Sequence, residues 1–154
     1  MATTITAATL TVTLTESLSL GGNNFGGTKE LTIASITEAF KRVVRCMNSQ
    51  TTTIATFSGN AFASANAIDL EDAKYIRVTN LDDTNDVEVA VVGDATLYQV
   101  RLAAGESHIL GAPDDLMLAE ADTSPSFGTM ADIASIQVNP ASNDVDVEIF
   151  VAGV

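Results

Sequence analysis

Residues 9–15 read Thr-Leu-Thr-Val-Thr-Leu-Thr, a strict alternation of threonine with an aliphatic residue. Successive side chains of a β-strand point to opposite faces, so this stretch predicts a strand with one aliphatic face and one threonine face. We expect the strand to continue through Leu18 and Leu20. It should end in the loop 21–27, Gly-Gly-Asn-Asn-Phe-Gly-Gly, because glycine and asparagine tolerate backbone angles that other residues resist.

Short segments with strand-like patterns recur along the chain, separated by turns rich in Gly, Asn, Asp and Pro. Six of them predict three hairpins: 75–80 with 86–91, 97–102 with 106–110, and 133–138 with 145–151. Further strands are expected at 31–33 and 52–58. About eight to ten short strands with such turns favour an all-β fold, an antiparallel two-sheet sandwich of the jelly-roll kind with at most one short helix.

The stretch 35–47 permits two interpretations. Ser35 and Glu38 fit the capping box of a helix, and apolar residues recur after them at helical spacing. Against a helix, the sequence Val-Val-Arg-Cys-Met at 43–47 is rich in strand-forming residues. We therefore favour a turn followed by a strand at about 41–47, with a short helix as the alternative.

Length and composition indicate one domain with an aliphatic core. The chain has 154 residues, which predicts a single β-sandwich domain over 1–154, with residues 1–8 as an extended N-terminal arm. Hydrophobic residues make up 46% of the chain but aromatic residues only 5%, and Trp is absent. The core must therefore consist of Val, Ile, Leu and Ala with a few Phe, a mixture that suits pleated sheets.

Charge is strongly acidic and unevenly distributed. The formal net charge is −13, which argues against nucleic acid or a membrane surface as the partner, because both bind proteins through cations. Residues 1–68 carry about +1 and residues 69–154 about −14, so the first portion can approach another protein without strong repulsion. No segment approaches the roughly 20 apolar residues of a membrane span. A single cysteine, Cys46, excludes an internal disulfide.

Residues that could carry out catalysis are sparse. Gly21 and Gly26 have the spacing of a phosphate-binding loop, but Gly-Thr-Lys at 27–29 replaces the Lys followed by Ser or Thr that such a loop requires. His108 lies in a strand-like stretch where adjacent side chains face opposite ways, so it forms no local relay with its Ser and Glu neighbours. Cys46 is best interpreted as a small buried hydrophobic residue. We expect no enzyme, no catalytic residue and no cofactor.

Acidic clusters raise the question of structural calcium. Asp82, Thr84 and Asp86 have the spacing of the first, third and fifth EF-hand ligands, but Val87 and Gly93 stand where Gly and Glu are required. We assign no metal ligand on this motif. A looser calcium site between loops stays open as the alternative to solvated turns, with the candidate carboxylates Asp69, Asp72, Asp82, Asp83, Asp114 and Asp115.

Several segments together resemble small virion structural proteins of tailed bacteriophages, especially those of marine or cyanobacterial hosts. These segments are Thr9–Thr15, Arg42-Val43-Val44, Ser49–Ile54, Tyr75–Asn80, Arg101–Ser107 and Val147–Ala152. The resemblance covers most of the chain and rests on general pattern, so no functional residue is transferred by position. It implies a sandwich that oligomerises and binds the capsid shell or the tail.

On this basis the leading prediction is a non-enzymatic capsid decoration, or cement, protein that binds and stabilises the major capsid shell as a homo-oligomer, with a trimer favoured. The alternative is a tail or fibre component that recognises a host receptor or glycan. The protein is then expected in the virion after assembly in the host cytoplasm. For the contact with its partner we select Phe25, Lys41, Arg42 and Arg45 from the near-neutral portion. A hairpin tip and a solvated basic stretch would explain the same residues.

Overall fold

A computed structural model describes residues 4–59, 67–69, 72–93, 97–111 and 132–154 of the chain. These residues form strands and turns without a helix, so the all-β prediction is confirmed. The strands are β1 (Ala8–Glu16), β2 (Ser19–Leu20), β3 (Asn23–Asn24), β4 (Gly27–Ile36), β5 (Glu38–Cys46), β6 (Thr52–Ser58), β7 (Ala67–Asp69), β8 (Ala73–Asn80), β9 (Val87–Gly93), β10 (Leu97–Leu102), β11 (Ser107–Leu110), β12 (Ile133–Pro140) and β13 (Val145–Gly153).

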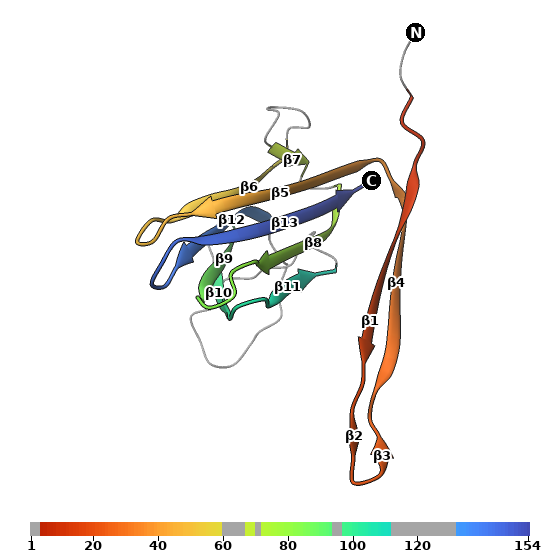
Figure 1. Cartoon of the computed structure of the whole chain (residues 1–154). Helices are drawn as coiled ribbons and strands as arrows, with labels where there is room; N and C mark the ends of the chain where they lie inside the picture. The colour runs from red at the N-terminus through yellow and green to blue at the C-terminus, as the bar shows by residue number, and fades with distance from the viewer. Residues whose placement is uncertain (1–3, 60–66, 70–71, 94–96, 112–131) are drawn as a thin grey trace, which may run out of the picture.

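Two sheets pack face to face and form the sandwich (Figure 1). One sheet has the order β11-β8-β13-β5 and the other the order β10-β9-β12-β6-β7. All pairings are antiparallel except the short parallel pair β6 and β7. If β5, β6 and β8 to β13 are counted one to eight, the sheets read 6-3-8-1 and 5-4-7-2, which is the strand order of a jelly roll.

The three predicted hairpins are wrong, although every strand in them exists. In each pair the two strands belong to opposite sheets: β8 and β9, β10 and β11, β12 and β13. Each turn therefore arches across the core instead of joining neighbours within a sheet. The alternation of apolar and polar residues identifies the inward face of a strand but not its hydrogen-bonding partner, so the sequence could not separate an arch from a hairpin.

The core lies between the sheets and is almost purely aliphatic. In β9, Val87, Val89 and Val91 are completely buried, and the residues between them face outward. In β13, Val147 and Ile149 are completely buried in the same way. β-Branched side chains lose little rotamer freedom on a pleated surface, which explains how a core with few aromatic rings can be well packed.

The first predicted strand exists, but it lies outside the sandwich. β1 pairs with β4 in a separate two-stranded sheet, and β2 pairs with β3 at its far end. Figure 1 shows this hairpin, which we call the arm (residues 8–36), projecting from the sandwich. The extended arm predicted for 1–8 differs: residues 1–3 are outside the described part, and 4–7 have no regular secondary structure. The single-domain assignment stays a prediction.

The ambiguous stretch 35–47 forms a turn and a strand, as favoured, and the helical alternative is wrong. β5 begins at Glu38, three residues before the expected start. The chain bends from the arm into the sandwich between β4 and β5, just after Ser35, whose φ of 64° lies in the left-handed region. Just beyond it, the Thr37 N–H donates to the carbonyl oxygen of Gly153 at 3.0 Å and ties the bend to the last strand.

Candidate assembly interface

The arm owes its narrow tip to glycine. Gly21 and Gly22 have φ values of 59° and 83°, and they form the two-residue turn with positive φ that joins β2 to β3. Gly26 is required for a different reason: a Cβ atom there would collide with the backbone carbonyl oxygen of Glu16. The predicted loop 21–27 is therefore the end of a continuous hairpin, and most of the loop residues belong to it.

The distal part of the arm exposes a row of large apolar side chains. Between 53% and 65% of each residue is open to solvent in Leu14, Leu18, Leu20 and Phe25, whereas Leu31, which pairs with Val12 nearer the base, is 41% exposed. Charged residues are few here, because the arm contains only Glu16, Lys29 and Glu30. An isolated two-stranded hairpin is marginally stable in water, and exposed apolar rows of this kind usually mark interaction sites. This row is the main candidate for a functional surface.

The base of the arm, by contrast, is packed against the sandwich. Leu10, Val12 and Ile33 are half-buried on a small second core that contains Tyr75 and Phe150. The Tyr75 and Phe150 rings lie 6.0 Å apart at an interplanar angle of 59°. Both rings point outward from the β11-β8-β13-β5 sheet, because their neighbours in sequence point into the main core. The arm is thus seated on the outer face of that sheet.

The outer face of the opposite sheet contains a shallow groove. Its volume is about 160 Å³, and it is lined by Thr51, Glu88, Ala90, Val92, Leu97, Gln99, Gln137, Val138 and Asn139. Ala90 has the smallest side chain of this group and lies on a strand with neighbours on both sides. Leu97 is 52% exposed at the edge strand. The groove's one charged residue, Glu88, is paired with Arg101 at 2.6 Å.

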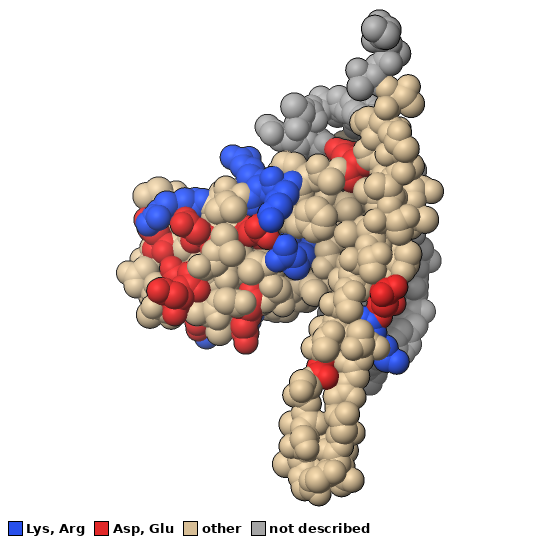
Figure 2. Space-filling view, turned by 45° about the vertical axis from the view of Figure 1, so that its right-hand side comes forward, with Lys and Arg blue, Asp and Glu red and all other residues tan. Residues whose placement is uncertain are grey.

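Three of the seven cations, Lys41, Arg45 and Arg77, lie on the other outer face, where each is paired with a carboxylate. Glu148 accepts from Arg77 at 2.7 Å and lies 3.0 Å from Lys41. Arg45 lies within 4 Å of carboxylates of Asp144 and Asp146. Figure 2 shows basic side chains next to acidic ones on the sandwich, whereas the arm carries few charges. The positive charges of Lys41, Arg45 and Arg77 on this face are therefore balanced by carboxylates of the same chain.

Glu148 should make part of the stability depend on pH. Hydrogen bonds from Lys41 and Arg77 lower the pKa of its carboxyl below the ordinary value of 4.5, so its contribution is present above that value and is lost as the pH falls through the lowered pKa. We expect Glu148→Gln to lower the free energy of unfolding by about 1 kcal/mol at pH 7. Urea denaturation from pH 7 to pH 3 should show the difference from the unaltered chain shrinking toward acid, and a difference independent of pH would contradict this role.

The four residues predicted to contact a partner do not form one patch. Phe25 follows β3 at the tip of the arm and is 62% exposed. Lys41 and Arg45 lie on the outer face of β5, which is in the sandwich. Arg42 alternates to the opposite face of that strand and forms no salt bridge within the described part of the chain. Phe25 thus belongs to the apolar row of the arm, whereas the cations lie elsewhere.

Sequence reasoning missed the rest of the apolar row, although its signal was present. The alternation over residues 9–15 predicted an aliphatic face of a strand but not where that face lies, and the arm keeps its Leu14 exposed. The acidic balance of the chain also drew attention to cations. An apolar face that is nearly free of charge in a chain of net charge −13 was the informative feature.

The residues considered for catalysis, His108 and Cys46, are held by packing and hydrogen bonding within the sandwich. The hydroxyl oxygen of Tyr98 lies 2.9 Å from Nε2 of His108, and this contact joins the edge strands β10 and β11 of the two sheets. Burial raises the pKa of Tyr98 and lowers the pKa of His108. Cys46 is completely buried, and this burial raises the pKa of its thiol. A thiol held in its neutral form and remote from solvent is a poor nucleophile.

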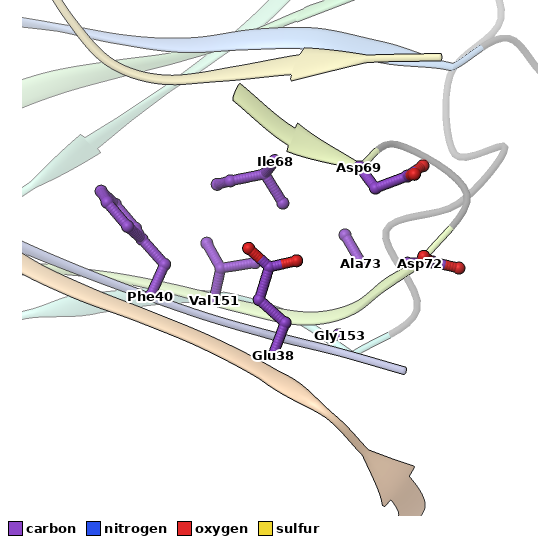
Figure 3. A pocket seen from close by; sticks show the side chains of 8 residues that line it. All are labelled: Glu38, Phe40, Ile68, Asp69, Asp72, Ala73, Val151 and Gly153. Atoms are coloured by element: carbon purple, nitrogen blue, oxygen red, sulfur yellow. The ribbon is translucent and has the colours of Figure 1, made fainter. Parts of the chain in front are cut away.

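The acidic residues considered for calcium are dispersed. Asp82 accepts hydrogen bonds from the N–H groups of Thr84 and Asn85, which shape a turn and lower the pKa of this carboxyl. Asp69 and Asp72 line a hollow too small for a water molecule, and Figure 3 shows their carboxylates apart from that of Glu38. Within the described residues, no three His, Cys, Asp or Glu side chains are placed to hold a metal ion. Asp114 and Asp115 are outside the described residues.

Comparisons with known proteins leave the family open. No family model matches the chain, and no curated protein matches it. Among solved structures, similarity is found to a protein described under "Bacillus endospore appendages form a novel family of disulfide-linked pili", with 9% identity, a TM-score of 0.41, and coverage of 76% of this chain and 87% of that chain. That neighbour is an appendage protein and not a phage protein. At this TM-score no functional inference follows.

No helix long and apolar enough to cross a membrane occurs in the described residues.

Proposed function

We propose that this chain is a non-enzymatic structural protein that assembles with copies of itself, and that the distal arm makes the contact. The observation that carries the proposal is the exposed apolar row on a hairpin for which the described part of the chain offers no packing partner beyond its base. Cys46 is buried, and His108 shares a hydrogen bond with Tyr98, and both observations support a role without catalysis.

The free energy available from burial of the apolar row favours an assembly with many contacts over a single contact. Burial of the still exposed part of Leu14, Leu18, Leu20 and Phe25 contributes on the order of 5 kcal/mol before any cost. Association consumes about 4 to 15 kcal/mol in lost translational and rotational freedom alone. One arm therefore binds weakly, whereas several arms in one assembly bind tightly through their high effective concentration. A multicopy assembly suits these energetics.

For the setting of this assembly we propose the outer surface of a phage capsid, which the sequence resemblance implies. A shell presents many copies of one site, so an oligomer with weak individual contacts gains avidity there. The alternative, a tail or fibre component, predicts a different distribution. Electron microscopy of particles with the labelled protein distinguishes the two, because decoration gives uniform coverage of the head and a tail component labels a single vertex.

Self-association should depend on the arm. We expect Leu18→Ser combined with Leu20→Ser to abolish assembly, because both side chains are more than half exposed on the arm and would bury their apolar surface only against a neighbour. Light scattering after size exclusion, over a range of concentrations, should show a multiple of 16.0 kDa for the unaltered chain and a single chain for the variant.

The matched control replaces two exposed residues on the threonine face of β1 in the same arm, Thr11→Ser with Thr13→Ser, and should retain the assembled mass. An unaltered chain that stays at 16.0 kDa at every concentration would contradict self-assembly, as would an unchanged mass for the leucine variant.

A further inference from the structure

We propose that the groove on the outer face of strands β10, β9 and β12 receives the distal arm of a second copy of this chain. This inference rests on the proposed self-assembly and names the surface that completes it. The groove and the apolar row of the arm are then the two halves of one interface, each present once on every copy.

The placement of the two surfaces makes the contact intermolecular. The base of the arm is seated beside Tyr75 and Phe150 on the outer face of one sheet. The groove, centred on Ala90, lies on the outer face of the other sheet, so the thickness of the sandwich separates it from the chain's own arm. The arm also projects away from the sandwich (Figure 1). A chain cannot fill its own groove, but its neighbour can.

Charge selects this face over the rest of the surface. In a chain of net charge −13, two copies repel unless the surfaces that meet are close to neutral. The outward residues of β9, β10 and β12 include one acid and one base, Glu88 and Arg101, and these two are paired. The arm has a net charge of only −1. The two surfaces can therefore meet without the repulsion that acidic faces would meet elsewhere.

The lining of the groove suits an aliphatic side chain with a polar border. Ala90 leaves space at the centre, and Val92 and Leu97 supply apolar contact at one end. Gln99 and Gln137 flank the centre with amide groups, which can donate to and accept from the backbone of an inserted hairpin. An apolar centre with an uncharged polar rim is the usual composition of a protein interface.

An arm-to-groove contact uses different surfaces on the two partners and is heterologous. Such contacts close into rings when the rotation between copies allows it, and otherwise continue as filaments. A ring is consistent with the trimer expected from the sequence. A contact between two arms would instead be symmetric and would stop at a dimer.

Blocking the groove tests the assignment. We expect Ala90→Arg, or Gln99→Arg at the neighbouring position, to reduce the protein to single chains in light scattering, because the long side chain fills the groove. The control Val43→Arg adds the same side chain to an exposed position on the opposite outer face and should leave the assembled mass unchanged.

Mixing two single-chain variants gives the decisive measurement. The Ala90→Arg chain keeps its arm, and the Leu18→Ser, Leu20→Ser chain keeps its groove, so one intact junction can form between them. Because one junction binds weakly, we expect a mixed species with twice the mass of one chain at the upper end of the concentration range, and this species also shows that both variants are folded. Assembly of Ala90→Arg and Gln99→Arg chains like the unaltered chain, failure of the mixture to associate even at the highest concentration, or loss of assembly in Val43→Arg would overturn the groove assignment. Self-assembly through the arm is contradicted by separate results, namely an unaltered chain that stays at 16.0 kDa at every concentration or a leucine variant of unchanged mass.

Discussion

Replacement of Asn80 by alanine is expected to lower the free energy of unfolding by about 3 kcal/mol, a large loss for one side chain. Asn80 is completely buried. Its Nδ2 donates to the carbonyl oxygens of Asn85, Leu102 and Ala103 at 2.8 to 3.2 Å, and its Oδ1 accepts from the N–H of Asp82 at 3.0 Å. Alanine would remove all of these hydrogen bonds at one end of the sandwich, although the Ala103 carbonyl oxygen would still accept from the N–H of Glu106.

Urea denaturation of the purified variants measures this loss. Asn80→Asp has the same shape but directs a carboxylate at three carbonyl oxygens, so it should destabilise the protein at least as much at pH 7. Asn23→Ala at the exposed tip of the arm is the matched control and should change the free energy of unfolding by less than about 0.5 kcal/mol. A loss below about 1 kcal/mol for Asn80→Ala would show that water satisfies the freed groups.

Tyr75→Ala is expected to loosen the arm and to lower the free energy of unfolding by about 3 kcal/mol. Tyr75 is 3% exposed and supports the half-buried residues at the base of the arm, Leu10 and Val12 among them. Its removal opens a cavity between the arm and the sandwich. Hydrogen exchange of the backbone amides should become faster throughout β1 and β4, because the arm then loses part of its packing against the sandwich.

Val43→Ala is the control for this substitution, because Val43 is 54% exposed on the same sheet. It should alter the free energy of unfolding by no more than about 0.5 kcal/mol and leave exchange in the arm unchanged. If Tyr75→Ala lowered stability but exchange in residues 8–36 stayed the same, Tyr75 would serve the sandwich alone, and the proposed seating of the arm would be wrong.

The arches explain a similarity between distant parts of the sequence. The stretch Ile-Arg-Val at 76–78 leads to Asn-Asp-Val at 85–87, and Ile-Gln-Val at 136–138 leads to Asn-Asp-Val at 143–145. Both turns cross from one sheet to the other, and their asparagines meet where Asn143 donates to Asn85 at 2.9 Å. The sequence showed a recurring unit, but its pairing depended on contacts with strands far along the chain.

The candidate site was only partly predictable for a related reason. Phe25 was selected because its loop is rich in glycine, and it does lie in the exposed apolar row. The three selected cations are close in sequence, but they divide between the two faces of β5, and Lys41 and Arg45 are neutralised by acids of β13. Pairing between strands that are about 100 residues apart is invisible in local composition.

Local sequence determined the elements of this protein: the strands, the glycine turn of the arm, the aliphatic core and the acidic surface. These features follow from side-chain periodicity and backbone preference, which act over a few residues. Only the tertiary structure decided which strands share a sheet, that the clearest strand leaves the sandwich, and that a neutral groove lies on the face opposite the arm. Those outcomes depend on which apolar surfaces remain to be buried once the sheets have closed, and that is a property of the whole chain.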